Sequence, residues 1–147
     1  MTGVDNTEKL DFMRSLGADH AIDYTREDFT RNSKQYDFIL DLIAYRSAFA
    51  YARALKPNGS YYAVGGSFAT FLQFLLFGPW IRRTSARNVR LLMVQRNRKD
   101  LEAITELCVS GKVVPVIDKV YSLSEVPDAL RYLGEGHAKG KVVITVG

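Results

Sequence analysis

The sequence predicts an α/β fold built on a doubly wound parallel sheet. Segments with the two-residue period of strands alternate with segments of helical period along the 147 residues. The stretch YDFILDLI, residues 36–43, is a nearly continuous apolar run. Such a run is typical of a central parallel strand that is buried on both faces. Gly17, the KPNG turn at residues 56–59, and Gly111 each follow a helical segment, as expected of helix ends.

The expected elements follow one another in β-α-β order. Strands are predicted at residues 2–5, 20–24, 36–43, 60–66, 88–94, 113–121 and 140–146. Helical segments are predicted at residues 6–18, 25–29 (one polar turn), 45–55, 101–108 and 126–133. An insert of two aromatic-rich turns, residues 67–87, separates the fourth strand from the fifth. Pro115 confines the sixth strand to an edge or a bulge. Ser122 and Glu125 have the spacing of a capping box.

Size and composition indicate one globular domain that is neither disordered nor membrane-bound. The chain has 47% hydrophobic and 24% charged residues, and its net charge is +4. Charges of both signs alternate, which favours a solvated surface over a nucleic-acid or membrane partner. The longest apolar run has about a dozen residues, fewer than the ~20 of a membrane span. No signal peptide is visible, so we expect a soluble, cytoplasmic protein.

Cysteine and histidine are too sparse for a disulfide or a zinc site within this chain. Cys108 is the single cysteine, and His20 and His137 lie far apart in the sequence. No nucleophile–base pair and no paired carboxylates stand out, so no catalytic residue is assigned. The sequence therefore predicts a binding domain rather than a complete reaction centre.

Asp5 ends the first expected strand. In a dinucleotide-binding fold, an acidic residue at the tip of the second strand accepts hydrogen bonds from the adenosine ribose. Asp5 alone is as well explained as the N-cap of the following helix. Lys9 and Tyr24 could border the same pocket and bind a 2′-phosphate, which Asp5 would repel. A solvated lysine and a half-buried edge aromatic are the alternatives.

Gly65 and Gly66 end the fourth expected strand at the carboxyl edge of the sheet, where open α/β folds bind ligands. Their amides could meet a carboxamide or a phosphate, although a tight turn would also explain two glycines. The glycine-rich phosphate loop G-x-G-x-x-G does not occur in the 147 residues. The predicted fold is therefore a Rossmann-like sheet that lacks its first strand and its glycine-rich loop, which leaves residues 36–43 without one neighbour.

Several stretches together resemble the carboxyl-terminal half of the medium-chain dehydrogenase/reductases, in the branch of quinone oxidoreductases and zinc-type alcohol dehydrogenase-like proteins. They are residues 2–29, 36–43, 53–66 and 111–146. The last, with VVPVIDKVYSLSEVPDALRYL followed by GHAKGKVVI, is the most specific.

The resemblance implies an NAD(P)H-dependent oxidoreductase that transfers hydride to or from a quinone, carbonyl or alcohol substrate. In the family, Lys9 and Tyr24 correspond to residues that serve the 2′-phosphate, Asn6 and Thr7 fill neighbouring positions, and Gly65 and Gly66 meet the nicotinamide end. NADPH is thereby favoured over NADH, although Asp5 resembles the acid of NAD users. Residues 1–147 would be a truncated Rossmann domain with the family's carboxyl-terminal tail, and the GroES-like catalytic domain would be absent. A homodimer is expected, with the apolar insert at an interface.

Two other classes remain open. The acidic strand tip and the ALKPNGSYYAVGG stretch also occur in S-adenosylmethionine-dependent methyltransferases, although SLGADHAIDY and GHAKGKVVITV do not fit that class. A non-catalytic domain that binds a nucleotide or a partner is the other alternative, because hydride transfer needs donor and acceptor held together.

Overall fold

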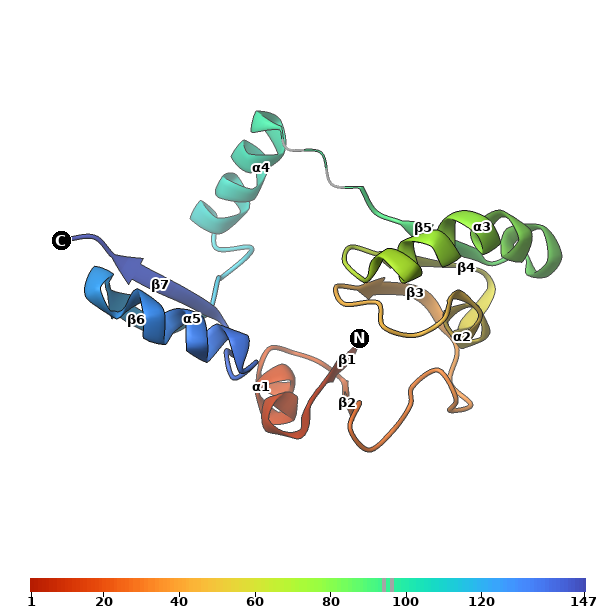
Figure 1. Cartoon of the computed structure of the whole chain (residues 1–147), viewed down its shortest axis with the longest axis horizontal. Helices are drawn as coiled ribbons and strands as arrows, with labels where there is room; N and C mark the ends of the chain where they lie inside the picture. The colour runs from red at the N-terminus through yellow and green to blue at the C-terminus, as the bar shows by residue number, and fades with distance from the viewer. Residues whose placement is uncertain (94, 96) are drawn as a thin grey trace. The chain divides into compact units, whose positions relative to one another are not determined.

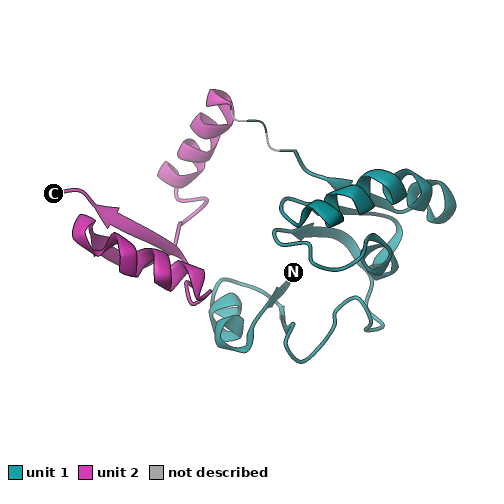
Figure 2. Ribbon diagram, viewed as in Figure 1, with its two compact units in different colours: residues 1–95 teal, residues 96–147 magenta. Residues whose placement is uncertain are grey.

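The computed structural model describes residues 1–93, 95 and 97–147, which form two compact units, residues 1–95 and 96–147 (Figure 2). Figure 1 labels the helices and strands along the chain. The strand pairs of both units are parallel. The α/β class with parallel strands that the sequence predicts is therefore confirmed. Among the described residues, no helix combines the length and the apolar character that crossing a membrane requires.

The first sheet of unit 1 contains two strands. β1 (Thr2–Asp5) pairs with β2 (His20–Asp23), and the 3₁₀ turn η1 (Thr7–Lys9) and helix α1 (Leu10–Ser15) connect them. Helix α1 lies so close to β1 that a Cβ on Gly3 would meet Sδ of Met13 at 2.6 Å. A larger residue at this position would require the flexible Met13 side chain to move away from the strand.

The second sheet of unit 1 has the strand order β3-β4-β5. Its strands are β3 (Tyr36–Asp41), β4 (Leu55–Ala63) and β5 (Asn88–Leu91). Helix α2 (Ala48–Ala54) joins β3 to β4, and its N-cap Ser47 accepts a hydrogen bond from the Ala50 amide. Helix α3 (Phe68–Ser85) joins β4 to β5 and begins at the N-cap Ser67. In the fifth predicted strand, the last position, Val94, lies outside the described residues.

The buried core of unit 1 lies between this second sheet and helices α2 and α3. Tyr51 of α2 and Tyr61 of β4 stack with ring centroids 4.1 Å apart, and Phe74 of α3 packs against both. Tyr51 and Tyr61 are 1% and 0% exposed. The alternation of small and aromatic residues in α2 lets the helix approach the sheet closely while its tyrosine fills the space beneath.

Two connections differ from the sequence prediction. The insert 67–87 forms one continuous helix, α3, rather than two turns, and the helix continues through Pro79. A Cβ on the preceding Gly78 would meet the Val89 carbonyl oxygen at 2.8 Å, so the helix lies directly on β5.

Strand β4 begins at Leu55, and the KPNG residues interrupt its register with β3, with Asn58 at φ 65°. They form a bulge in the strand where a turn before it was expected.

Unit 2 contains helix α4 (Arg98–Val109), strands β6 (Ile117–Ser122) and β7 (Lys141–Thr145), the turn η2 (Leu123–Glu125) and helix α5 (Val126–Gly134). Strand β6 pairs in parallel with β7 and begins after Pro115, four residues later than predicted. The predicted capping box is confirmed, because Oε2 of Glu125 accepts the Ser122 amide at 2.8 Å.

Candidate functional site

The tip of β1 carries the first group of predicted site residues. Oδ1 of Asp5 accepts the amide of Asn6 at 2.8 Å and lies 3.8 Å from Nζ of Lys9. The side chain of Lys9 is only 17% exposed, so this cation lies against the tip rather than in free solvent. The tip therefore carries a paired negative and positive charge. The role of Asp5 as a conventional N-cap is not seen, because the N-cap of η1 is Asn6 and its side chain makes no capping bond.

Thr7 is engaged within the protein. Its hydroxyl donates to Oδ2 of Asp23. The side chain of Asp23 is 8% exposed, and its Oδ1 atom accepts hydrogen bonds from the amide and the hydroxyl of Thr25. The hydrogen bond from the Thr25 side chain, and to a smaller extent the one from Thr7, hold the pKa of Asp23 below its ordinary value. Thr7 therefore fastens η1 to the end of β2, and its hydroxyl is already used.

Asn6 offers an acceptor that the protein leaves unused. Its Oδ1 atom is buried and has no hydrogen-bond partner among the described residues. A buried acceptor without a partner is costly, and a hydroxyl donor placed beside it would satisfy it. The acceptor set at the tip of β1, a carboxylate and an amide oxygen, thus fits the hydroxyl groups of a ribose.

Tyr24 directly follows β2 and is 43% exposed. Its ring meets the edge of Tyr45, from the loop after β3, with centroids 6.4 Å apart. The guanidinium carbon of Arg46 lies 5.0 Å from the centroid of the Tyr45 ring. The ends of β2 and β3 therefore meet through two aromatic side chains, a contact that the sequence does not reveal.

Asp41, the last residue of β3, is the principal residue that the sequence analysis missed. Its Oδ1 atom accepts the amides of Ile43 and Ala44, and Oδ2 accepts the Tyr61 hydroxyl at 3.0 Å. Burial alone would raise the pKa of Asp41, but these amides and the hydroxyls of Tyr51 and Tyr61 hold it below the ordinary value. An acidic residue at the end of an apolar strand was the available signal.

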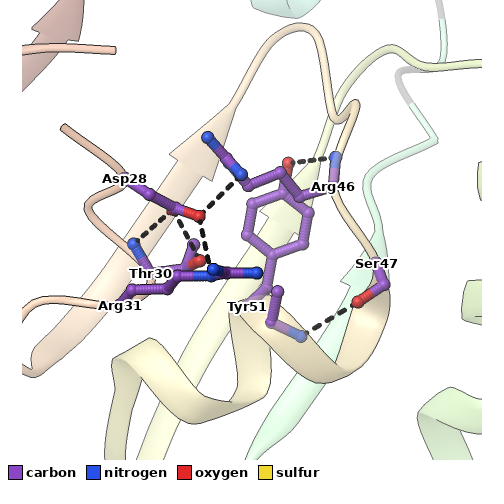
Figure 3. Close-up of polar contacts among 7 residues, drawn as sticks. Asp28, Thr30, Arg31, Arg46, Ser47 and Tyr51 are labelled. Carbon is purple, nitrogen blue, oxygen red and sulfur yellow. Dashed lines mark hydrogen bonds and ion pairs between the residues drawn. The ribbon is translucent and has the colours of Figure 1, made fainter. Parts of the chain in front are cut away.

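The loop after β3 is fastened from a second side. Figure 3 shows the carboxylate of Asp28 between Thr30, Arg31 and Arg46. Nη1 of Arg46 lies 2.6 Å from this carboxylate, and the Arg46 amide donates to the Tyr51 hydroxyl at 3.1 Å. Both charged side chains are largely buried, at 19% and 25% exposure. The long turn after β2 and the loop after β3 are thus held together by an ion pair shielded from solvent.

Gly65 and Gly66 lie just beyond β4, and packing accounts for both. A Cβ on Gly65 would lie 2.4 Å from the Leu42 carbonyl oxygen, and Gly66 adopts φ 144° against Ala44. The loop after β4 therefore touches the loop after β3 at a distance that only glycine allows. This close approach brings the backbone of the two glycines to the same region as Asp41.

A cavity of about 550 Å³ adjoins the carboxyl ends of β1 and β3. Its walls include Asp5 at the end of β1 and Tyr24 just after β2, together with Asp41 at the end of β3 and Tyr45 in the loop that follows β3. Of the predicted site residues, the structure thus brings Asp5 and Tyr24 to this cavity, with Lys9 paired to Asp5. Gly65 and Gly66 do not line it. In the described part of the chain, no group of three His, Cys, Asp or Glu side chains is placed to hold a metal ion.

Parallel strands with polar groups at their carboxyl ends define the class of open α/β domains that bind nucleotides at that edge. Residues 16–144 match the family of zinc-binding dehydrogenases, and the chain belongs to this family. It is 34% identical over 141 residues to the chloroplastic NADPH-dependent alkenal/one oxidoreductase of Arabidopsis thaliana, covering 95% of this chain and 32% of the relative. It is 30% identical to the mitochondrial NAD(P)H oxidoreductase RTN4IP1 of Danio rerio, covering 96% and 41%.

Solved structures show the same fold. The quinone oxidoreductase of Coxiella burnetii superposes with a TM-score of 0.75 at 24% identity, over 99% of this chain and 44% of that one. An NAD-dependent alcohol dehydrogenase superposes with a TM-score of 0.78 at 22% identity, over 99% and 43%. The chain thus spans less than half the length of these relatives, and it corresponds to the carboxyl-terminal part of the family.

Proposed function

We propose that this chain is the cofactor-binding part of an NAD(P)H-dependent oxidoreductase that transfers hydride to or from a quinone, carbonyl or alcohol. The observation that carries the proposal is the acceptor set at the tip of β1. There the Asp5 carboxylate lies 3.8 Å from Nζ of Lys9, and the buried Oδ1 of the adjacent Asn6 has no hydrogen-bond partner within the described part of the chain. The named relatives are NAD(P)H-dependent oxidoreductases, in agreement with this function. When bound, the nicotinamide ring supplies the hydride chemistry.

The residues of this chain bind and orient the cofactor in the proposal. Asp5 and Asn6 accept hydrogen bonds from hydroxyl groups of the adenosine ribose. Thr7 keeps η1 in place through its hydrogen bond to Asp23. Tyr24 borders the adenosine from the end of β2. The backbone at Gly65 and Gly66 meets the nicotinamide end, on the loop that packs against Leu42. No residue of the chain is assigned a catalytic role.

We further propose NADPH as the preferred cofactor. A lone carboxylate at the strand tip would repel a 2′-phosphate, but Nζ of Lys9 lies 3.8 Å from Asp5 and offsets its charge. In this proposal Lys9 meets the 2′-phosphate directly. The first relative described above is named as NADPH-dependent.

The whole protein is proposed to include a GroES-like catalytic domain, with residues 1–147 as an incomplete Rossmann domain and family tail. We propose a homodimer, because α3 exposes apolar side chains that include Phe68, Leu76 and Trp80, at 76%, 67% and 56%. A cytoplasmic location is also proposed, and relatives named as chloroplastic and mitochondrial make it a point to test by localisation of the tagged protein.

The test of the cofactor proposal is a calorimetric titration of the chain with NADPH, NADH and S-adenosylmethionine. NADPH should bind more tightly than NADH, and Lys9→Gln should weaken NADPH binding while leaving NADH binding nearly unchanged. Lys34→Gln, at an exposed lysine, makes the same charge change and serves as the control. Equal losses for both dinucleotides would contradict the phosphate role of Lys9, and binding of S-adenosylmethionine alone would contradict the oxidoreductase assignment.

A further inference from the structure

A second cavity of unit 1 lies between helix α3 and strand β5. Its volume is about 460 Å³, which is within the range of small-molecule sites. All of its lining residues belong to α3 or β5. None of them lines the cavity beside Asp5 and Asp41, so this second cavity is separate from the proposed cofactor site.

Much of the wall of this cavity is apolar. Phe74 of α3 and Val89 of β5 line it and are each 3% exposed. The two elements approach closely here, since a Cβ on Gly78 would meet the Val89 carbonyl oxygen at 2.8 Å. Leu75 and Leu91 extend the wall, and Leu75 is 58% exposed. Covering this apolar surface would be favourable in water.

Two arginines line the same cavity. Arg82 lies in the last turn of α3 and Arg90 lies in β5, and both side chains are exposed. Within the described part of the chain, neither guanidinium group forms an ion pair with a carboxylate. Two cations at one small cavity repel one another, and an anion in the cavity would attract both. The planar guanidinium group is well suited to a carboxylate.

The surrounding elements do not supply that anion. Residues 42–93, which include α2, β4, α3 and β5, contain seven lysine and arginine residues and no aspartate or glutamate. The remaining strand of this sheet, β3, carries Asp37 and Asp41. The Asp37 carboxylate pairs with Lys56. The Asp41 carboxylate accepts hydrogen bonds from Tyr61 and the loop after β3. The carboxylate that suits the two arginines is therefore one that a ligand brings.

We propose that the cavity between α3 and β5 binds a free amphipathic anion of the fatty-acid class. The alkyl chain covers Phe74 and Leu75, and the carboxylate meets Arg82 and Arg90. Burial of the chain supplies most of the affinity, and the two arginines select an acid over the corresponding alcohol. A single chain reaches the recessed Phe74, whereas the surface of a bilayer does not.

This inference depends neither on the proposed cofactor nor on the proposed dimer. The exposed residues of α3 that support the dimer, Phe68, Leu76 and Trp80, do not line the cavity. Ligand binding can therefore be measured on the 147-residue chain without a dinucleotide.

The experiment is a calorimetric titration with decanoate, and decanol serves as the neutral ligand of the same chain length. Decanoate should bind more tightly than decanol. Added sodium chloride should weaken the binding of decanoate alone, because salt screens the exposed guanidinium groups. In nuclear magnetic resonance spectra, both ligands should shift the amide signals of Gly78, Val89 and Leu91.

Variants separate the role of charge from that of apolar contact. Arg82→Gln and Arg90→Gln should each weaken decanoate binding about three- to fivefold and leave decanol binding unchanged. Arg83→Gln is the matched control, because it makes the same charge change at an exposed position outside the cavity. Leu75→Gln should weaken the binding of both ligands. Leu76→Gln, which is exposed and does not line the cavity, should bind both ligands as the parent does.

Several outcomes would overturn the proposal. Equal losses of decanoate binding in Arg82→Gln and Arg83→Gln would show a general attraction to positive charge rather than a site. Binding to vesicles that contain phosphatidylglycerol, with no binding of soluble decanoate, would assign the arginines to a membrane surface. Shifts at Gly78 and Val89 with NADPH but not with decanoate would assign the cavity to the nucleotide. Absence of decanoate binding in calorimetry and in the amide spectra would show that the cavity takes no such ligand.

Discussion

The hydroxyl of Tyr61 donates a hydrogen bond of 3.0 Å to Oδ2 of Asp41, and so joins β4, near its carboxyl end, to the carboxyl end of β3. Tyr61 is fully buried, and burial, together with the charges of Tyr51 and Asp41, raises the pKa of its hydroxyl well above the ordinary value. The hydroxyl therefore stays protonated and acts as a permanent donor. The other carboxylate oxygen holds the loop after β3, so one side chain connects the buried core to the edge of the proposed cofactor site.

Replacement of Asp41 by alanine should lower the free energy of unfolding of unit 1 by about 2 kcal/mol, since two amides and a buried hydroxyl lose their acceptor. Urea denaturation followed by far-ultraviolet circular dichroism measures this loss. The exposed Asp37, which pairs with Lys56 at the surface, is the control. Its alanine variant should unfold almost as the parent does, and equal losses would show that the Asp41 contacts contribute little.

Acid should remove the contribution of the Asp41 charge. The folded-state pKa of Asp41 is lower than the ordinary value near 3.8, so the unfolded state takes up protons first as the pH falls. Its contribution is fully present above that ordinary value and is lost as the pH falls through the lower, folded pKa. The stability difference between the parent and Asp41→Asn should therefore shrink below pH ~4. A difference that stays constant from pH 7 to pH 3 would mean that the charge is not involved.

Gly65→Ala should destabilise unit 1 by about 2 kcal/mol, because the new Cβ would lie 2.4 Å from the Leu42 carbonyl oxygen. The substitution should also weaken dinucleotide binding if the loop lies at the nicotinamide end. Gly134→Ala is the control in helix α5, where a Cβ meets nothing within 4 Å. It should be neutral or slightly stabilising in thermal denaturation, since alanine favours helix over glycine.

Ala86 ends helix α3 in the left-handed conformation, with φ 53° and ψ 26°. Ala86→Gly should raise the free energy of unfolding by about 1 kcal/mol, because glycine adopts this conformation without the penalty that a Cβ brings. The same substitution at Ala103, an exposed position in the middle of helix α4, should lower the free energy of unfolding by ~0.5–1 kcal/mol. Changes of the same sign at both positions would contradict the conformational explanation.

Asp5→Asn should move cofactor preference further toward NADPH. The substitution removes the negative charge beside Lys9 and leaves that cation free to meet a 2′-phosphate. NADPH affinity should rise about threefold, while NADH, which lacks the phosphate, should lose the carboxylate as a ribose acceptor and bind less tightly. Parallel calorimetric titrations measure both changes. A gain for NADH would instead show that Asp5 does not contact the ribose.

Local periodicity was sufficient to predict most elements of the fold. The capping box of Ser122 and Glu125 reflects contacts between near neighbours, which the sequence pattern records directly, and the apolar run at residues 36–43 does contain strand β3. The prediction that this strand is central and buried on both faces was wrong for this chain, because β3 is the edge strand of its sheet and Phe38 and Leu40 are 59% and 53% exposed. The errors came where tertiary contacts override local signals. Helix α3 passes through Pro79 because its apolar residues pack on α2 and β5, and the KPNG residues become a bulge because Leu55 already pairs with Tyr36.

The sequence by itself determined the parallel α/β class, the acidic tip at Asp5, and the absence of a glycine-rich loop, because these depend on residue type and spacing along the chain. Only the tertiary structure showed that Lys9 pairs with Asp5 and that the Thr7 hydroxyl donates a hydrogen bond to Asp23. It also showed that Asp41 holds the loop after β3 by accepting a backbone amide of that loop. Only the structure also showed that the open edges of β1 and β3 border one cavity. Such contacts join residues far apart in the chain, and the shared packing of strands and loops brings them together, which no local pattern encodes.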